Sequence, residues 1–488
     1  MNGATHGLQG GARPEPRGGD LPRDARQKSG AWIFFLLVAV YLLSYSGNFH
    51  AIDEVSVVAM TENMVKRGQV TTDQIRWSLA WTPSQGQLGP EGHLYSKKGV
   101  GSALLGAPFY WFGLKIPEAG HVRAVMLANV LVTALTVWLL YSCVQMLGYR
   151  SVVAALTALS YGLGTMAWPY AKYFFSEPLT ALGLVTGLWG LLVFRQRQQL
   201  RYPLLAGLGL GIALLAKVAN IIVWPLFVIF GLLMANQVQQ NAPHTRAGSG
   251  KVKGLLPFAV SLLTPMAVAG LGLAAYNLVR SGSPVDLGYA SDEVFSTPLL
   301  RGLAGLLVSP GKGLFLYSPI LFVALAGIPA LLRRDKAVAL LSLGVAIAFP
   351  LLYAGWFMWW GGWSWGPRFV VPSLPFLCLF LAPVWAWSLQ PRRGWSLVML
   401  AILLMASFWV QVLGVAVDFN EYLLHLYQRG LDSGQINFDV PLSPILGHWT
   451  MLRSVLAGPD PASRLDLSWA RDLPQGMNWP QLLVPLLL

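Results

Sequence analysis

The chain has 488 residues, of which 55% are hydrophobic and 11% are charged, and its mean hydropathy is +0.54. A soluble protein could not cover so many apolar side chains with polar surface, so the composition excludes a soluble globular protein and predicts a polytopic membrane protein. The net charge of +13 would suit a nucleic-acid partner, but the placement of the basic residues, described below, makes that role unnecessary.

Apolar segments recur along the chain, and each is long enough to cross about 30 Å of hydrocarbon as a helix. We therefore expect an all-α polytopic membrane protein with about 11 transmembrane helices. The stretch 203–235 could form one long helix, but we divide it at the polar AKVAN sequence (216–220) because two crossings keep the basic clusters on one side. The predicted spans are residues 31–47, 121–147, 150–169, 174–194, 203–217, 218–235, 254–275, 318–332, 337–355, 369–389 and 395–416.

Basic residues gather on one side of these spans. The N-terminal tail and the loops on its side hold 17 of the 34 Lys and Arg residues but only four of the 21 Asp and Glu residues, so this side is predicted to be cytoplasmic. We expect a disordered cytoplasmic tail (1–30), a transmembrane domain (31–416) with a first extracytoplasmic loop at 48–120, and an extracytoplasmic C-terminal region (417–488). The predicted location is the cytoplasmic (inner) membrane. We expect membrane lipids as partners and no nucleic acid.

Two adjacent carboxylates, Asp53 and Glu54, open the first outer loop in the sequence NFHAIDEVSVVAM (48–60). Asp53 shares one helical stripe with Val57 and Met60, whereas Glu54 points about 100° away. This pattern predicts an amphipathic helix on the membrane surface with one carboxylate directed inward. Capping of that helix by Asp53 is the alternative interpretation, because Asp is a preferred N-cap residue.

The same loop ends in YSKKGVGSALLGAPFYWFG (95–113), an apolar, glycine-containing segment too short to span the membrane. We expect a second surface helix here, preceded by Tyr95, Lys97 and Lys98. Ammonium groups and free backbone N–H groups at its start would bind an anion at the level of the lipid headgroups. Contact with anionic lipid headgroups alone is the alternative.

The second outer turn, WPYAKYFFSEPLTA (168–181), contains Lys172 and Glu177. Lys172 could simply extend to the membrane interface. Glu177 lies about one turn inside a predicted span, where a carboxylate costs roughly 2–3 kcal/mol unless it is paired or faces a wet cavity. It is therefore a candidate for the functional site, with a buried pair to Lys172 or Lys217 as the alternative.

Later outer segments add further candidates. In WFMWWGGWSWGPRFVVPSLPF (356–376), an aromatic belt at the interface explains most of the tryptophans, Trp363 is a candidate substrate contact, and the guanidinium of Arg368 suits bidentate binding of a phosphate. The polar loop 276–298 adds Arg280. The sequence contains no His/Cys cluster with metal spacing and no Walker or Rossmann motif. We therefore predict no cofactor, with a requirement for a divalent cation as the alternative.

In chain order these segments resemble the GT-C superfamily of membrane glycosyltransferases, most closely the protein O-mannosyltransferase and aminoarabinose-transferase branch that uses polyprenyl-phosphate-linked sugars. The resemblance covers about residues 30–420. The segments that carry it are DE (53–54), YSKKGVG with LLGAPFY, FFSEPLTA, GLGLGIALLAKVAN (207–220), SPGKGLFLYSP (309–319) and GGWSWGPRFVVPSLPF (361–376).

The resemblance implies a role for several of these residues. The acid of the first loop is the catalytic base in such enzymes, which maps to Asp53 with Glu54 beside it, and the lysines late in that loop contact the lipid phosphate. Glu177 corresponds to an assisting acid, although many relatives have Asp or a pair of metal-binding acids there. The candidates are thus Asp53, Glu54 and Glu177 as catalytic residues, Lys97, Lys98, Lys172 and Arg368 for the donor phosphate, and Tyr95, Arg280 and Trp363 as substrate contacts.

The chemistry expected from this resemblance is transfer of a hexosyl or pentosyl group from a polyprenyl-phosphate donor to an acceptor hydroxyl. A base at membrane level would activate the hydroxyl of a lipid, glycan or protein, and cations would stabilise the departing phosphate. A single displacement predicts inversion at the anomeric carbon. The alternative from another class is a secondary transporter or flippase, which also places charges on a substrate path.

Overall fold

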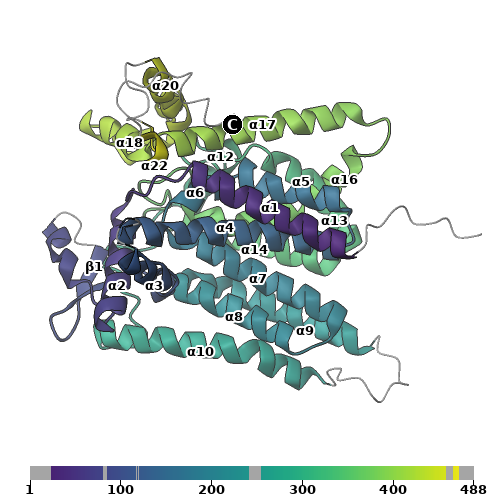
Figure 1. Ribbon diagram of the computed structural model, residues 1–488, viewed down its shortest axis with the longest axis horizontal. Helices are drawn as coiled ribbons and strands as arrows, with labels where there is room; N and C mark the ends of the chain where they lie inside the picture. Colours follow the sequence, from purple (N-terminus) through teal and green to yellow (C-terminus); the bar gives the residue numbers. More distant parts are fainter. Residues whose placement is uncertain are drawn as a thin grey trace, which may run out of the picture.

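The computed structural model describes residues 23–80, 85–116, 118, 120–240, 254–457 and 465–471. Long helices lie side by side in an elongated bundle, with α10 (Leu255–Ser281) along one edge and α17 (Gly394–Ala416) along the opposite edge (Figure 1). Most of the predicted cytoplasmic tail, residues 1–22, lies outside the described residues, as do parts of the predicted C-terminal region. The described part of the chain is helical apart from one short hairpin and the connecting loops, which confirms the predicted all-α membrane architecture.

Every predicted span coincides with a helix or a short series of helices. Seven of the described helical segments are long and apolar enough to cross a membrane, whereas others, such as α5 and α8, are shorter. The number of crossings therefore stays a prediction. Besides α10 and α17, the helices at predicted spans are α1 (Arg23–Leu43), α4 (His121–Met146), α5 (Ser151–Gly164), α7 (Ser176–Arg197), α8 (Arg201–Ala216), α9 (Trp224–Gln240), α13 (Leu321–Arg334), α14 (Lys336–Ala354), α15 (Leu374–Leu379) and α16 (Leu381–Ser388).

The chain breaks between α8 and α9 at the polar sequence where two spans were predicted to meet. Lys217 has extended backbone dihedrals, and a short 3-10 helix, η4 (Val218–Val223), follows it. The Asn220 side chain holds this turn, because it donates to the carbonyl oxygen of Ala213 at 2.6 Å and to the Thr180 hydroxyl at 3.1 Å. The turn places the Lys217 ammonium at the end of the bundle.

The first outer loop forms a compact cap at that end of the bundle. It contains the two expected surface helices, α2 (Ile52–Arg67) and α3 (Val100–Lys115), which Figure 1 shows at the end where β1 is labelled. Between them lie η1 (Asp73–Ala80) and an antiparallel hairpin that the sequence analysis did not predict. Its strands β1 (Gly86–Leu88) and β2 (Leu94–Ser96) pair with Gln87 opposite Tyr95.

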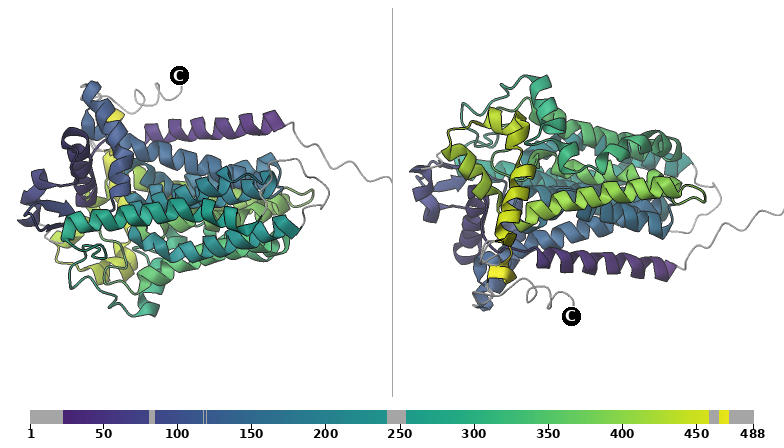
Figure 2. Two further views of the ribbon diagram at one scale, coloured as in Figure 1. Left: turned by 90° about the horizontal axis from the view of Figure 1, so that it is seen from below. Right: turned by 90° about the horizontal axis from the view of Figure 1, so that it is seen from above.

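Several short helices complete the same end. Those of the C-terminal region run across the end of α17 rather than along it, as Figure 2 shows from above. Their bounds, with those of the other short elements, are α6 (Ala167–Lys172), α11 (Leu299–Val308), α12 (Leu314–Tyr317), η5 (Arg368–Ser373), α18 (Phe419–Gln428), α19 (Ser433–Phe438), η6 (Val440–Leu442), α20 (Pro444–Ala457) and α22 (Ser468–Arg471).

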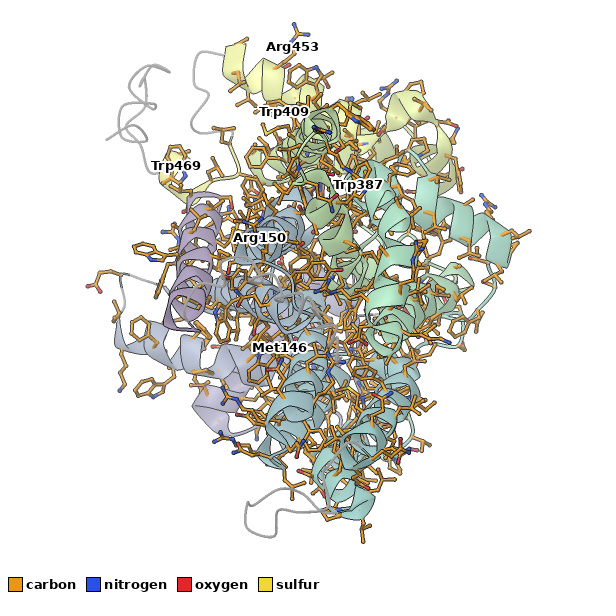
Figure 3. The ribbon with its side chains drawn as sticks, turned by 90° about the vertical axis from the view of Figure 1, so that its right-hand side faces the viewer. Met146, Arg150, Trp387, Trp409, Arg453 and Trp469 are labelled. Carbon is orange, nitrogen blue, oxygen red and sulfur yellow. The ribbon has the colours of Figure 1, made fainter. Side chains whose placement is uncertain are left out.

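The opposite end of the bundle carries the basic residues that were predicted to face the cytoplasm. Figure 3 views the molecule from this side, with Arg150 at the start of α5. The Arg334 guanidinium donates to the carbonyl oxygens of Leu147 and Gly148, each at 2.7 Å, and Arg195 pairs with Asp335. The two ends of the bundle are thus chemically distinct.

Glycines allow α7 and α8 to pack closely. A Cβ atom on Gly183 of α7 would fall on the carbonyl oxygen of Gly209 in α8, and one on Gly209 would fall on the carbonyl oxygen of Gly183. Small residues at such contacts let helix backbones approach in a membrane, where the hydrophobic effect gives no drive for helix association. This contact sets the position of the Lys217 turn relative to the start of α7.

We expect Gly183→Ala to lower the thermal stability of the detergent-solubilised protein, because an added methyl group at a tight helix contact costs about 1–3 kcal/mol. The matched control is Gly272→Ala in α10, where no atom lies within 4 Å of the added Cβ. Melting temperatures from tryptophan fluorescence compare the two variants with the original protein. Equal melting temperatures for both variants would contradict the close contact.

Candidate functional site

A cavity of about 740 Å³ lies at the end of the bundle that the first outer loop covers. Segments far apart in the sequence form its wall: the start of α2, the lysines before α3, the start of α7, the Lys217 turn, the end of α10 and η5. Six of the ten predicted site residues line it, namely Asp53, Lys97, Lys98, Glu177, Arg280 and Arg368.

Asp53 is shared by two cations within this cavity. Its Oδ1 atom lies 2.8 Å from the Lys98 ammonium, and its Oδ2 atom accepts a hydrogen bond from Arg368 Nη1 at 2.9 Å. The three side chains are 13% to 22% exposed, so the cluster is largely removed from water. Burial acts to raise the pKa of Asp53, but the charges of Lys98 and Arg368 outweigh it and hold that pKa well below its usual range.

Lys98 is the titratable cation of this cluster. Burial lowers its pKa to about 8, because the loss of hydration outweighs the attraction of Asp53, while Arg368 and Lys97 add repulsion. The ammonium is therefore charged at neutral pH and loses its proton just above it. Asp53 stays ionised throughout this range.

Glu177 forms the buried pair that the sequence analysis left as an alternative, and it also lines the cavity. Its Oε1 atom lies 3.0 Å from the Lys217 ammonium, which in turn sits 4.1 Å from the centre of the Phe369 ring. The two interpretations are thus compatible. The pair comes from the first turn of α7 and from the break after α8, so the close packing of these helices aligns it.

A third charged group faces the cavity from the other side. Lys97 Nζ lies 2.5 Å from Glu293 Oε1, and both side chains are almost buried. Arg280 is held by acceptors of the protein itself, because it donates to the carbonyl oxygens of Ser96 at 3.2 Å and Asp286 at 3.0 Å, and to the Asn277 side chain at 2.9 Å. These contacts support a structural role for Arg280 in the cavity wall better than a role as a cation that is free to bind substrate.

The cavity continues into an apolar strip. Val218, Ile221 and Ile222 of η4 form it together with Leu273 of α10 and Leu352 of α14. Ile221 is 53% exposed and Ile222 is 38% exposed, so the strip reaches the outer surface of the bundle. In a chain that spans a membrane, this surface meets lipid, and the cavity offers a sideways path for an apolar chain.

The loop that delivers Arg368 depends on a buried lysine. Gly361, Gly362 and Gly366 adopt positive φ angles, which bend the chain sharply just before η5. Lys312 Nζ donates to the carbonyl oxygens of Gly362 at 3.1 Å and Ser364 at 2.7 Å, inside this bend. Although Lys312 belongs to a segment that carried the family resemblance, sequence reasoning gave it no role.

Glu54 does not face the cavity, although it follows Asp53 directly. It is fully buried, and its carboxylate accepts hydrogen bonds from the backbone N–H groups of His50 (2.5 Å), Ala51 (3.0 Å) and Phe174 (2.6 Å). Burial raises the pKa of Glu54 in spite of these bonds. Glu54 thus ties the first turn of α2 to the segment before α7, and its catalytic role stays a prediction without a contact to the cavity.

Three other predicted site residues also lie outside the cavity lining. Lys172 is buried beneath it, where its ammonium contacts Asp466. The Tyr95 ring is buried in the hairpin against Gly89. Trp363 stacks on Tyr427, with ring centres 5.3 Å apart. All five tryptophans of 356–365 are at least partly buried, so packing accounts for them better than the predicted aromatic belt.

Some wall residues were missed as site residues by the sequence analysis. Lys217 was considered only as a pairing partner for Glu177, and Glu293 only as one charge in a polar loop. Tyr353 looked like an ordinary residue of a span, yet it lines the cavity beside Lys217. Among the described residues, no three His, Cys, Asp or Glu side chains gather as a metal site would need, and a metal requirement stays untested.

The chain is similar to one protein family and to several proteins of known structure. A family model described as dolichyl-phosphate-mannose-protein mannosyltransferase matches residues 102–261. ArnT from Cupriavidus metallidurans is 17% identical in its apo state, with a TM-score of 0.50 over 87% of this chain and 76% of that chain. ArnT bound to undecaprenyl phosphate is 16% identical, with a TM-score of 0.49 over 88% and 76% of the two chains.

An oligosaccharyltransferase from Archaeoglobus fulgidus in the apo form is 14% identical, with a TM-score of 0.49 over 88% of this chain and 63% of that chain. No curated protein sequence matches the chain. At such identities the similarity establishes the fold alone. The chain thus shares its helical membrane fold with ArnT, and the resemblance to the GT-C superfamily is supported at the level of the fold.

We expect Glu54→Ala to destabilise the protein strongly, because it strands three buried N–H donors and each costs about 1–3 kcal/mol. Glu54→Gln should be milder, since its amide oxygen can still accept. Glu62→Ala on the exposed face of the same helix serves as control, because it removes only surface contacts, chiefly the pair with Lys66 and a 3.4 Å hydrogen bond from Gln74. Thermal unfolding in detergent measures all three, and equal losses for Glu54→Ala and Glu62→Ala would refute the anchoring role.

Proposed function

We propose that this protein is an inverting glycosyltransferase that moves a sugar from a polyprenyl-phosphate donor to an acceptor hydroxyl on the extracytoplasmic face of the membrane. The observation that carries the proposal is the position of Asp53. It lies between Lys98 and Arg368 in a cavity whose apolar strip reaches the outside of the bundle. A base, two cations for a phosphate and a groove for a lipid chain are thus next to one another.

The comparisons support the class of donor. The description of the matching family names dolichyl phosphate mannose, and ArnT is described as bound to undecaprenyl phosphate. Dolichol and undecaprenol are both polyprenyl lipids, so the shared chemistry is a sugar on a polyprenyl phosphate. The match at 102–261 includes Glu177 and Lys217, whereas Asp53, Lys98 and Arg368 lie outside it. The argument for these three residues is therefore geometric.

The charges of the cavity suit a phosphate. Five cations and three carboxylates line the cavity, so the described lining carries an excess of two positive charges. A phosphate monoester that leaves the sugar carries close to two negative charges at neutral pH. The cations are Lys97, Lys98, Lys217, Arg280 and Arg368, and the carboxylates are Asp53, Glu177 and Glu293.

Donor binding would also change the basicity of Asp53. In the free protein both of its oxygens are engaged by cations, which makes the carboxylate a weak base. When the donor phosphate takes up Lys98 and Arg368, those contacts weaken and the pKa of Asp53 rises toward the range of a useful base. Base activation then depends on the presence of the donor.

The transfer is one displacement. Asp53 accepts the proton of the acceptor hydroxyl while the hydroxyl oxygen forms a bond to the anomeric carbon. The bond from that carbon to the phosphate oxygen breaks, and the polyprenyl phosphate leaves with the electron pair beside Lys98 and Arg368. Attack opposite the leaving group inverts the anomeric centre. The Glu177–Lys217 and Lys97–Glu293 pairs offer donors and acceptors for sugar hydroxyls.

The location of the cavity favours an enzyme over a transporter or flippase. The charged lining residues gather at one end of the bundle, whereas secondary transporters bind their substrates near the middle of the membrane. The basic residues at the other end indicate that the cavity faces away from the cytoplasm. We therefore propose an inner-membrane protein with a cytoplasmic N-terminus and an extracytoplasmic C-terminal region.

We expect Asp53→Asn to lower the transfer rate by about 10²- to 10⁴-fold, because the variant lacks the base. Its affinity for undecaprenyl phosphate should stay at least as high as in the original protein, since Lys98 and Arg368 no longer have a competing carboxylate. Purified protein in lipid nanodiscs, incubated with a panel of polyprenyl-phosphate sugars, gives the rate as release of lipid phosphate. Glu62→Gln on the same helix is the matched control. A rate near that of the original protein in folded Asp53→Asn would show that Asp53 is not the base, whereas no release of lipid phosphate by the original protein would favour the transporter.

Donor binding should weaken as the pH rises through the pKa of Lys98. This pKa is about 8 in the free protein, and only the protonated form attracts a phosphate. Affinity for undecaprenyl phosphate is thus highest below pH 8 and should fall by up to about tenfold per pH unit above it. Lys98→Arg should remove this decline, because its guanidinium stays charged. Binding titrations from about pH 7 to 9.5 test this, and identical pH profiles of the two proteins would show that Lys98 does not hold the phosphate.

A further inference from the structure

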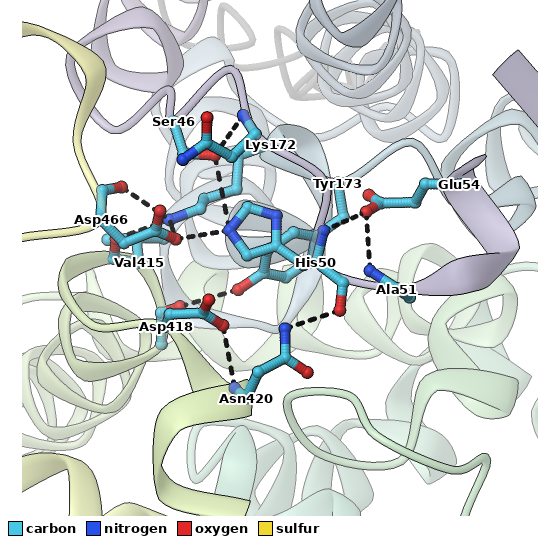
Figure 4. Close-up of polar contacts among 12 residues, drawn as sticks. Ser46, His50, Ala51, Glu54, Lys172, Tyr173, Val415, Asp418, Asn420 and Asp466 are labelled. Carbon is cyan, nitrogen blue, oxygen red and sulfur yellow. Dashed lines mark hydrogen bonds and ion pairs between the residues drawn. The ribbon is translucent and has the colours of Figure 1, made fainter. Parts of the chain in front are cut away.

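A buried polar network outside the cavity lining joins three distant parts of the chain (Figure 4). One carboxylate oxygen, Asp466 Oδ2, lies 2.7 Å from His50 Nε2 and 2.5 Å from the Lys172 ammonium. The His50 and Lys172 side chains are each 1% exposed and Asp466 is 6% exposed, and none of the three lines the cavity. The proposed transfer chemistry gives this network no direct role.

The two partners of Asp466 belong to the segments that bring acids to the cavity. His50 lies three residues before Asp53, and Lys172 lies five residues before Glu177. Asp466 therefore bridges the entry to α2 and the entry to α7. Burial acts to raise the pKa of Asp466, but the charges of Lys172 and His50 keep it low, so the bridging group is a carboxylate at neutral pH.

The segment that carries Asp466 is docked through its own backbone. The N–H group of Asp466 donates to the carbonyl oxygen of Ala416 at 2.9 Å, and that of Ser468 donates to the carbonyl oxygen of Tyr45 at 2.8 Å. The indole N–H of Trp469 donates to the carbonyl oxygen of Leu43 at 2.7 Å. The C-terminal segment, residues 465–470, thus bridges the outer ends of α1 and α17.

The network connects to the cavity through Glu54. The backbone N–H of His50 donates to Glu54, which also accepts the N–H of Phe174. The His50 ring packs edge to face on Tyr173, with centres 4.7 Å apart, and Asn420 donates to the His50 carbonyl oxygen at 2.7 Å. The same two segments are therefore joined twice, by Glu54 next to the cavity and by Asp466 below it.

We infer that Asp466 is a positioning residue, and that the C-terminal segment clasps the entries to α2 and α7 so that Asp53 and Glu177 keep their places in the cavity. The inference rests on the proposed function. Without the Asp466 carboxylate, the Lys172 ammonium keeps only the Val415 carbonyl and the Asp466 backbone carbonyl as acceptors. The His50 ring then keeps only the Ser46 hydroxyl, 3.5 Å from its Nε2 atom, as a polar partner. The first turn of α2 is then less restrained, and the Asp53 carboxylate moves away from the position in the cavity that the transfer requires.

Asp466→Ala tests the clasp in the full chain. We expect kcat to fall by about 10²-fold, as for other displacements of a catalytic group by about 1 Å. The KM for the donor should change by less than about twofold, because Lys98 and Arg368 do not contact Asp466. Asp466→Glu should recover part of the rate. The matched control is Asp432→Asn, which replaces one helix-capping residue of the C-terminal region with another that caps equally well.

A second variant separates positioning from simple stabilisation. Lys172→Met with Asp466→Leu removes both buried charges and replaces them with apolar side chains of similar size, so it should fold even where the single variants do not. It still lacks the contact to His50. We expect its melting temperature to stay near that of the original protein while kcat stays low. Recovery of both kcat and melting temperature would overturn the inference.

Hydrogen exchange of the backbone gives a readout that needs no substrate. The amides of His50, Ala51 and Phe174 donate to Glu54, so loosening of the two segments should accelerate their exchange in Asp466→Ala but not in Asp432→Asn. Unchanged exchange together with unchanged kcat would overturn the clasp. If no polyprenyl-phosphate sugar is turned over by the original protein, the proposed function fails, and the exchange data alone decide whether the clasp exists.

Discussion

The structure depends on one buried ionic arrangement, a single carboxylate held between two cations. Asp53, Lys98 and Arg368 come from the start of α2, from the turn before α3 and from η5, so no local element can bring them together. Removing three charges from water is costly unless they compensate one another. One carboxylate cannot neutralise two cations, and an unmet positive charge remains. That remainder underlies the proposed preference of the site for an anion, because the other charged lining residues are Lys97, Glu177, Lys217, Arg280 and Glu293, which add only one further positive charge.

Buried charged residues outside the cavity lining have a different role from those that line the cavity. Glu54 and Lys312 contact backbone groups, at the first turn of α2 and in the bend before η5, and they fix the elements that carry Asp53 and Arg368. Their hydrogen bonds are satisfied by the protein itself, so they have no capacity left for a ligand. The groups of the cavity lining instead contact each other in pairs, which a phosphate or a sugar hydroxyl can enter.

Local properties of the sequence predicted where the helices lie, because hydropathy acts over one segment at a time. They also placed Asp53 among the candidates, and the structure shows it in the cavity lining. The helical stripe set Asp53 apart from Glu54, but it could not name the partners of Glu54, which are backbone N–H groups of His50, Ala51 and Phe174. The position of Lys172 outside the cavity lining could not be predicted from the sequence, because its partner Asp466 lies 294 residues later. The hairpin that buries Tyr95 and the stacking of Trp363 on Tyr427 also arise from contacts that no local pattern encodes.

The long separation between Lys172 and Asp466 has a consequence for assembly. The entries to α2 and α7 carry the two acids of the cavity, yet the carboxylate that joins them follows all of the predicted spans. Until residues 465–470 dock against α1 and α17, the Lys172 ammonium has no carboxylate partner in this network, and a buried ammonium without one is unfavourable. Docking of residues 465–470 therefore has to accompany the burial of Lys172, which couples this part of the C-terminal region to the first loop.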